Sequence, residues 1–544
     1  MKKLLFFLLI SNFFSAQWSI SNAERNALIA IHNATDGENW NRTWDLEKDP
    51  RNWYGVAIKN GVVTELNLTG NALNGYFPTN ISSLTRLTKL DLSNNKLSGE
   101  VAMGISSLSS LVKLDVSNNR LIGNPTNSLS GLSNLEDLGL GGNSFTIPDV
   151  NTLLQNFNNI KILNIADLGL INIPAKINTF ANLETLILDN NPIPFNAYGN
   201  ISGLTKLKIL SLSGTGLNQL PTQVSQRTQL TTLNLSNNNF TEQSLTGISN
   251  LINLEWLSLE NNQLAQIPTQ LTSLQKLQTL NLGRNKISGS IGTLTSLGNL
   301  QQLFLNNNQL TGNFPSALLG MSKLMMVNLN SNQLTGDLPD QLPAITHISN
   351  NRFNKSQLSN YILDFAEQTD FNYSPQRYDQ EKTVLAVVGQ PATLDQSLSG
   401  DYAFTWFKNL DQKLNSPTEN LNFSSVENTD FAVYTAEAYT YSVLDNNILF
   451  DLSLFREPIA LQDALATTEN DQKNINIYPN PAKDYINIIN VKHQIEKVVI
   501  FDLSGKQMIS DNKQRINVSK LPSGVYLLSV KTEDGLKNFK FIKQ

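Results

Sequence analysis

The stretch that decides the fold is LTKLDLSNNKLSG at residues 87–99, because the same frame returns as LQTLNLGRNKISG at residues 277–289. Both segments read L-x-x-L-x-L-x-x-N-x-L, and the frame recurs at intervals of 23 to 25 residues. Leu168 and Thr215 replace the asparagine in two copies, and a shortened last copy places Asn351 after 19 residues. The intact asparagine column consists of Asn71, Asn95, Asn119, Asn143, Asn191, Asn238, Asn262, Asn285, Asn308 and Asn332.

A repeat of this kind predicts a stack of similar coils. The two leucines of L-x-L point inward from a short strand, and the residue between them points outward. One coil cannot cover its own apolar face, so neighbouring coils must bury it. The asparagine amide offers both a donor and an acceptor to main-chain groups exposed by the turn. Thr215 can supply part of this bonding and Leu168 none, so we expect a local irregularity near Leu168.

The pattern resembles the leucine-rich repeat, and the resemblance covers residues 62–353 in about 12–13 copies. It implies an α/β solenoid with a parallel sheet on the concave face and an irregular or 3₁₀-helical convex side. Return segments such as LTGNFPSALLGMSK carry L-x-G-x-x-P and resemble the plant type, whereas LAQIPTQLTSLQK resembles a shorter bacterial type.

Both ends of such an array need covering, and the flanking segments suit that role. Residues 17–61 are expected to form an N-terminal cap, with a capping box of Ser21 and Glu24 opening a helix. Its tryptophans are interpreted as a shield for the first coil, and stacking on sugar rings is the alternative; they are Trp40, Trp44 and Trp53. Residues 354–374 are expected to form a C-terminal cap and linker, with Leu358, Ile362 and Phe365 at helical spacing.

Two small all-β sandwich domains are expected after the repeats. Residues 375–460 resemble an immunoglobulin-like sandwich, with Trp406 as the core tryptophan and Tyr434 as the corner tyrosine. The chain departs from that family because Ala436 and Leu394 stand where it often has a disulfide. Residues 461–474 are a polar linker in this interpretation.

The last segment, residues 475–544, resembles the C-terminal sorting domain of type IX secretion substrates in the Bacteroidetes. The resemblance implies transport by the type IX machinery, followed by release or attachment to the outer-membrane surface. The residues that carry the resemblance are Tyr478, Pro479, Asn480, Pro481, Gly505, Leu521, Pro522, Gly524 and Tyr526.

The beginning of the chain is interpreted as a signal peptide at residues 1–16, cleaved after Ala16. Lys2 and Lys3 precede an apolar stretch that is too short to span a bilayer, and no transmembrane segment is expected in the mature chain. The net charge of −5 argues against a nucleic-acid partner. With no cysteine and three scattered histidines, we expect no cofactor and no metal.

Function is assigned to the outward positions of the coils, because the repeat itself is scaffold. Most of these positions are small and polar. Two apolar groups differ and are the predicted ligand-binding residues: Trp256, Phe304 and Met326, and Ile162, Ile187 and Ile209. Asp91 and Asp115 are not expected to be a catalytic pair, because an open, solvated sheet does not shift their pKa values.

The favoured hypothesis is a secreted or cell-surface binding or adhesion protein that is not an enzyme. Its concave face would bind an extracellular protein, peptide or glycan. A passive structural component of the surface or matrix is the first alternative, and an accessory protein of a secreted hydrolase is the second.

Overall fold

The computed structural model describes residues 19–365, 370–444, 447–464, 476–489, 491, 495–502, 506–533 and 535–544. The expected signal peptide and most of the expected linker lie outside these residues. Two compact units make up the chain, Met1–Arg377 with Tyr441–Leu452, and Tyr378–Thr440 with Ser453–Gln544.

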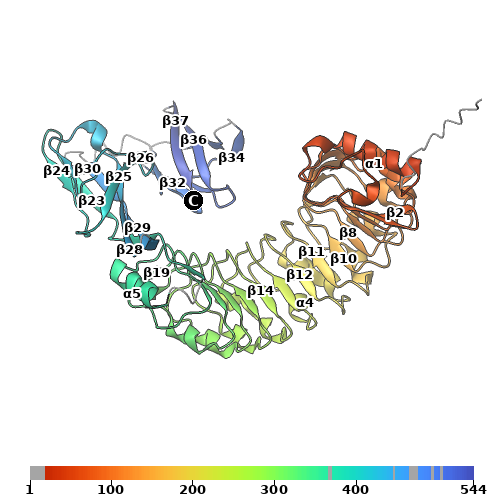
Figure 1. Ribbon diagram of the computed structural model, residues 1–544, viewed down its shortest axis with the longest axis horizontal. Coiled ribbons are helices and arrows are strands. Elements are labelled where there is room, and N and C mark those ends of the chain that lie inside the picture. Colours follow the sequence, from red (N-terminus) through yellow and green to blue (C-terminus); the bar gives the residue numbers. More distant parts are fainter. Residues whose placement is uncertain are drawn as a thin grey trace, which may run out of the picture. The chain divides into compact units, whose positions relative to one another are not determined.

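A parallel sheet of 15 strands runs through the first unit, with one short strand contributed by each coil (Figure 1). It begins with the hairpin of β1 (Val56–Lys59) and β2 (Val62–Asn67), the antiparallel pair in this sheet. The parallel strands that follow are β4 (Lys89–Asp91), β6 (Lys113–Asp115), β8 (Asp137–Gly139), β10 (Ile162–Asn164), β11 (Thr185–Ile187), β12 (Ile209–Ser211), β13 (Thr232–Asn234), β14 (Trp256–Ser258), β15 (Thr279–Asn281), β16 (Gln302–Phe304), β18 (Met326–Asn328), β20 (Ile345–His347) and β21 (Asp370–Asn372).

The return segments are short helices, as the leucine-rich repeat pattern predicts. Most are 3₁₀-helices: η3 (Thr79–Ser83), η4 (Met103–Ser107), η5 (Ala175–Thr179), η6 (Phe195–Ile201), η7 (Glu242–Leu245), η8 (Ile248–Asn250), η9 (Thr269–Ser273), η10 (Gly292–Ser296) and η11 (Ser316–Gly320). Three are single α-helical turns: α2 (Thr126–Leu129), α3 (Val150–Leu154) and α4 (Thr222–Ser225).

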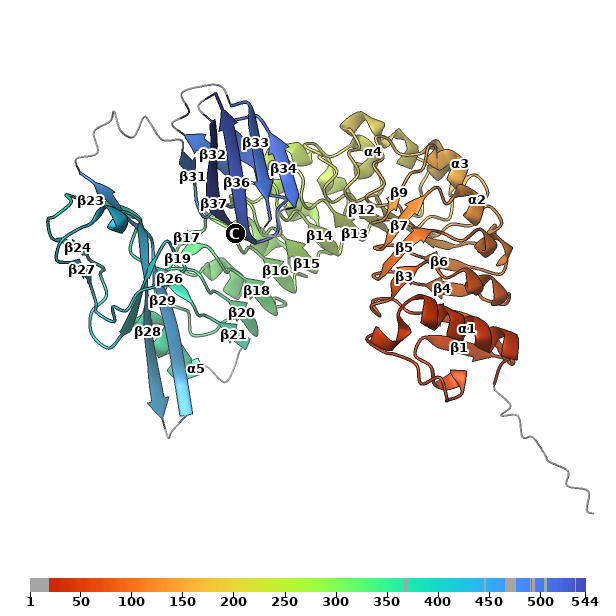
Figure 2. The ribbon, with the colours of Figure 1, turned by 90° about the horizontal axis from the view of Figure 1, so that it is seen from above.

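The first coils also contain a second, smaller sheet that the repeat pattern did not predict. It is parallel and follows the order β3 (Asn74–Tyr76), β5 (Lys96–Glu100), β7 (Arg120–Gly123) and β9 (Ser144–Phe145) (Figure 2). A further pair, β17 (Thr311–Gly312) and β19 (Gln333–Leu334), occurs near the other end. Three of these strands, β3, β17 and β19, lie at L-x-G-x-x-P returns, which are therefore extended before the chain continues.

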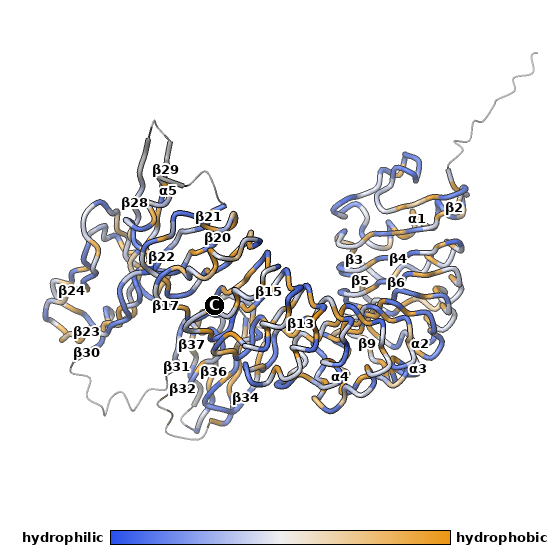
Figure 3. Tube along the Cα trace, turned by 90° about the horizontal axis from the view of Figure 1, so that it is seen from below, coloured by the Kyte–Doolittle hydropathy of each residue, from blue (hydrophilic) through white to orange (hydrophobic). Residues whose placement is uncertain are grey.

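The interior of the coils is filled by the leucine columns. Leu257 and Leu259, for example, are both 0% exposed, and the same holds for their counterparts in neighbouring coils. Figure 3 shows apolar residues recurring along the array. Burying one such side chain contributes about 1.5–3 kcal/mol, so the array is held by the sum of many equal terms rather than by one central core.

The asparagine ladder joins each coil to the one before it. Asn262 is typical: its Nδ2 donates to the carbonyls of Leu235, Leu259 and Glu260 at 3.0, 3.0 and 3.2 Å. Its Oδ1 accepts from the main-chain N–H of Phe240 at 2.9 Å. The amide thus satisfies main-chain groups of two coils that the turn would otherwise leave buried and unpaired.

Main-chain and side-chain groups outside the repeat close both ends of this ladder. At the start, Asn71 accepts from the N–H of Arg42 at 2.8 Å and donates to its carbonyl at 3.3 Å. At the end, the fully buried Gln376 takes the place of a further asparagine. Its Oε1 accepts from the N–H of Asn351 at 3.1 Å, and its Nε2 donates to the carbonyl of Ile348 at 2.9 Å.

The irregularity expected near Leu168 is present, and Thr215 shows the same one. In both coils a glycine with positive φ follows directly, Gly169 at 66° and Gly216 at 82°. The Thr215 hydroxyl still donates to the carbonyl of Leu212 at 2.9 Å, as expected. Asn191 of the next coil accepts from the N–H groups of both Leu168 and Leu170 at its Oδ1.

The segment before the repeats folds over the first coil. Helix α1 (Asn22–Ala34) begins at the predicted cap, where the Ser21 side chain accepts from the N–H of Glu24. Two 3₁₀-helices follow, η1 (Gly37–Asn39) and η2 (Pro50–Asn52). Three tryptophan rings of this segment pack on one another and are only 3 to 5% exposed, which supports shielding over sugar stacking: Trp44 meets Trp40 edge-on and stacks on Trp53.

Beyond the last repeat the chain forms α5 (Lys355–Phe365), with Leu358 and Ile362 buried, and then returns to the sheet as β21. The expected C-terminal cap therefore contributes a strand as well as a helix. The side chain of Phe365 lies outside the described part.

The region expected to be immunoglobulin-like consists of β-strands around the fully buried Trp406. Tyr434 donates its hydroxyl proton to the carbonyl of Asp430 at 2.7 Å, the bond that a corner tyrosine makes. The immunoglobulin-like assignment itself stays a prediction. The strands are β22 (Gln376–Tyr378), β23 (Lys382–Ala386), β24 (Ala392–Leu394), β25 (Ala403–Lys408), β26 (Gln412–Lys413), β27 (Leu421–Phe423), β28 (Val433–Leu444), β29 (Asn447–Arg456) and β30 (Ile459–Asp463), with η13 (Asn428–Asp430) between β27 and β28.

The last segment has two antiparallel sheets around one apolar core. The first sheet contains β31 (Asn476–Tyr478), β32 (Tyr485–Ile489) and β35 (Arg515–Asn517). The second follows the order β34 (Gln507–Asp511), β33 (Lys497–Phe501), β36 (Gly524–Thr532) and β37 (Gly535–Lys543).

Candidate functional site

The outward side chains of the long parallel sheet form one surface, which we call the sheet face. Each coil contributes the first and third residues of its strand, and the residue two positions further on. In β14 these are Trp256, Ser258 and Glu260. The cross-strand register then fixes which outward residues are neighbours, since adjacent strands lie about 4.8 Å apart.

The predicted aromatic group divides on this surface. Trp256 pairs in register with Thr279, which is followed by Gln302 and Met326, so three strand spacings separate Trp256 from Met326. Phe304 and Met326 lie on adjacent strands as diagonal neighbours, a separation of about 7–8 Å. All three predicted side chains are half-buried. The structure therefore brings Phe304 and Met326 together and leaves Trp256 as a separate ring.

The predicted isoleucine group is a staggered row over three coils. Ile162 and Ile209 stand on either side of Thr185 and are 39% and 38% exposed. Ile187 occupies the third position of the strand between them and is half-buried. The row is contiguous, but its side chains are small and offer no aromatic ring.

The first coils present a charged sheet face whose groups bind one another. Lys113 Nζ lies 3.0 Å from an oxygen of Asp91 and 3.5 Å from one of Asp137. Burial lowers the pKa of Lys113, but the hydrogen bond that it donates to Asp91, together with the negative charges of Asp91, Asp137 and Asp115, outweighs burial, so the pKa is raised. Burial raises the pKa of Asp137, against the opposing effect of Lys113. Asp115 accepts from the N–H and hydroxyl of Ser117 at 2.9 and 2.6 Å.

Sequence reasoning missed two features of this surface. The first is a row of residues with positive φ at the turn, just before each ladder asparagine, where Asn118 donates to Asn94 and Asn261 donates to Asn237. The paired asparagines in SNN and ENN were the available signal. The second is the outward column two positions after each strand, which includes Asn306 and Asn330. Its position in the repeat frame could have identified it.

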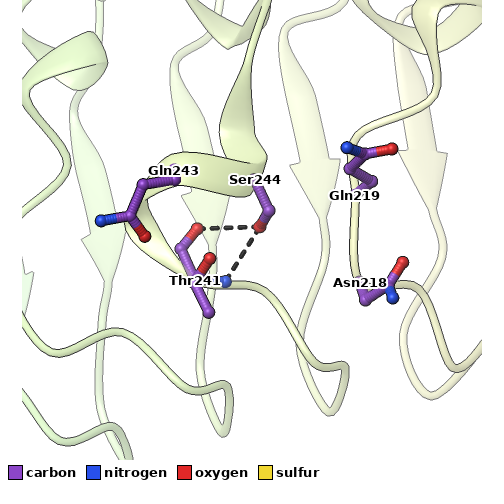
Figure 4. A pocket seen from close by; sticks show the side chains of 5 residues that line it. All are labelled: Asn218, Gln219, Thr241, Gln243 and Ser244. Atoms are coloured by element: carbon purple, nitrogen blue, oxygen red, sulfur yellow. Dashed lines mark hydrogen bonds between the residues drawn. The ribbon is translucent and has the colours of Figure 1, made fainter.

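One open depression of about 310 Å³ lies beside the turn around Thr241, away from the sheet face (Figure 4). Ser244 donates to the carbonyl of Thr241 at 2.8 Å and accepts from its N–H at 2.9 Å. Its polar groups thus serve the turn itself. The lining residues are Asn218, Gln219, Thr241, Gln243 and Ser244.

The sorting-motif residues mostly hold the last segment together. Asn480 donates to the carbonyl of Lys540 at 3.0 Å and accepts from the N–H of Ile542 at 2.8 Å, so its side chain covers part of the edge of β37. Tyr526 donates to the carbonyl of Pro522 at 2.9 Å. Tyr478 is 62% exposed, whereas Leu521 is buried. Gly505 lies outside the described residues.

Within the described ranges, no group of three or more acidic or histidine side chains could hold a metal ion. Of the helices in the same ranges, none is long and apolar enough to cross a bilayer.

Comparison with known families identifies both kinds of segment. Residues 61–121, 228–287 and 252–310 match the leucine rich repeat family. Residues 476–544 match the secretion system C-terminal sorting domain. The chain therefore carries a leucine-rich repeat solenoid and a C-terminal sorting domain.

Several solved structures are similar to this chain. A leucine-rich repeat protein of Leptospira interrogans is 28% identical, with 55% of this chain and 77% of that chain covered and a TM-score of 0.45. An internalin of Listeria monocytogenes is 25% identical, with 51% and 86% covered and a TM-score of 0.39. The Arabidopsis receptor kinase HAESA ectodomain, in complex with a peptide hormone, is 25% identical, with 66% and 62% covered and a TM-score of 0.48. No protein of curated function matches the chain.

Proposed function

We propose that this protein is a secreted or outer-membrane surface-attached binding protein, and that its sheet face takes an extracellular protein, peptide or glycan. The observation that carries the proposal is the placement of Trp256 and Phe304. Both rings are half-buried on a sheet whose other outward residues are mostly small and polar. Aromatic side chains that stay accessible at the centre of a surface are the usual anchors of binding sites.

The sorting domain supports the location. It matches a family of secretion signals, so export by the type IX machinery is the route we propose, preceded by removal of residues 1–16. Mass spectrometry of the native protein from culture medium and cell surface tests this. We expect a mature N-terminus at Gln17 and loss of the sorting domain; an intact chain confined to the cell interior would contradict it.

Binding through the sheet face is tested with the purified full-length chain on a biosensor. The analyte is an extracellular polymer and protein fraction from the source organism. Joint replacement of Trp256→Ala and Phe304→Ala should weaken the signal at least tenfold. The matched control replaces Met103 and Ile171 by alanine, because both are exposed apolar residues outside the sheet face, at 61% and 68%.

Two outcomes would redirect the proposal. Tight binding that persists after the double aromatic replacement would show that the ligand does not bind through the sheet face. Normal surface display with no measurable ligand would favour a passive structural component of the surface.

A further inference from the structure

The inference concerns the surroundings of Phe304 and rests on the proposed function. Side-chain carboxamides border its ring on four sides. Asn281 and Asn328 pair with it in register on the two neighbouring strands. Gln302 precedes it by two positions and Asn306 follows by two, about 6.8 Å away along the strand in each direction. We call these five residues the Phe304 platform.

Much of the hydrogen-bonding capacity of the platform is unused. The side-chain amides of Gln302 and Asn306 make no hydrogen bond within the part of the chain that the structure describes. Asn328 accepts from the N–H of Asn330 at 3.1 Å, which leaves its own NH₂ group available. The neighbouring Asn330 has a buried Oδ1 that lacks a partner among the described residues.

The first coils differ because their outward polar groups are already paired, as Asp91 and Lys113 are with each other. Gln302 and Asn306 thus leave polar side-chain atoms unpaired beside a partly buried ring, unlike the charged residues of the first coils.

The platform lies in an uncharged part of the sheet face. Between Thr232 and Asn330 a single outward residue, Glu260, carries a charge, and it accepts from Asn281 Nδ2 at 3.0 Å. The other outward residues there are Thr232, Asn234, Ser236, Trp256, Ser258, Thr279, Asn281, Gly283, Gln302, Phe304, Asn306, Met326, Asn328 and Asn330. These outward residues include no lysine or arginine, and Glu260 is already bonded to Asn281, so an anionic ligand would find no counter-charge here and the complementary partner is neutral.

We propose that the Phe304 platform binds an uncharged saccharide. One face of a pyranose ring is a patch of C–H groups that can lie on the Phe304 ring, and its hydroxyls project around the rim. The free amides of Gln302 and Asn306 and the NH₂ group of Asn328 fit that rim, whereas Asn281 already donates to Glu260 and accepts from the N–H of Gly283. Trp256 lies two strand spacings away and two residues along the strand direction, about 12 Å in all, and offers a second ring to a longer oligosaccharide.

The full-length protein is tested against an array of neutral gluco-, manno- and galacto-oligosaccharides, with alginate and heparin fragments as charged probes and a random peptide array alongside. We expect binding to at least one neutral oligosaccharide and none to the charged probes. Phe304→Leu should weaken it at least tenfold and Asn306→Ala several-fold, whereas Phe304→Tyr, which keeps the ring, should retain it. Ile171→Ala is the matched control, because this exposed apolar residue lies outside the sheet face, and unchanged melting temperatures confirm that each variant folds.

The outcomes separate this inference from the proposed function. Phe304-dependent binding to peptides alone, or to charged glycans alone, would overturn the saccharide and leave the sheet face as a binding surface. Absence of binding to every neutral glycan would also overturn it, whatever the biosensor shows. Saccharide binding that is unchanged in Phe304→Leu would show that the saccharide site is not the Phe304 platform.

Discussion

Replacing Asn262 by alanine tests the ladder that joins the coils. The Phe240 N–H would lose its partner and remain buried, at a cost of about 1–3 kcal/mol. The three carbonyls that Asn262 contacts each keep another donor: Asn238 Nδ2 for Leu235, Asn285 Nδ2 for Leu259, and a main-chain N–H for Glu260. Losing the hydrogen bonds to these three carbonyls therefore costs less than losing the bond to Phe240. We expect the free energy of unfolding to fall by about 3 kcal/mol in total.

The assay is urea unfolding followed by circular dichroism, together with hydrogen exchange of the peptide that contains Phe240. Asn239→Ala is the matched control, because that side chain is exposed and makes one long bond, to the carbonyl of Gly216 at 3.5 Å. Exchange at Phe240 should accelerate in Asn262→Ala and not in the control. A change below about 0.5 kcal/mol, or unaltered exchange at Phe240, would refute the reasoning.

Three further predictions follow from single positions. Leu168→Asn introduces the ladder asparagine that this coil lacks and should raise the free energy of unfolding by about 1 kcal/mol in urea titrations. A lower free energy of unfolding would show that packing of the leucine outweighs the new hydrogen bonds. Burial raises the pKa of Asp189. Its folded state therefore holds a proton more tightly, and stability should fall as pH rises through that raised pKa. Asp189→Asn should remove this dependence and be more stable at pH 7 in parallel melts, whereas identical pH profiles would contradict it. Asn480→Ala should expose the edge of β37 and speed its hydrogen exchange in the full chain, with exposed Asn476→Ala as control; unchanged exchange would show that the side chain does not protect that edge.

The repeat array could be predicted from sequence because one physical requirement recurs in every coil. Each leucine column must be buried and each turn needs an amide, so the frame identifies strands, interior and ladder together. The irregularity at Leu168 followed from the same logic. Gln376 could not be found this way, because it follows an inserted helix and supplies its amide from a longer side chain.

Only part of the candidate site could be predicted from the sequence. Phe304 stood out as an aromatic residue in an outward position, but its significance depends on neighbours from two other coils. Reading the register across strands would have placed Asn281 and Asn328 beside it. The free amide of Asn306 needed the structure, because sequence does not show which polar groups are already paired.

The two irregular coils have a mechanical consequence. At a regular junction the ladder amide adds two bonds between coils, as Asn119 does to Leu92 and Leu97. Where Leu168 and Thr215 stand, those links to the preceding coil are missing. If the array were stretched from its ends, the junctions that precede the coils of Leu168 and Thr215 would separate first. These two weaker junctions divide the array into three more rigid parts.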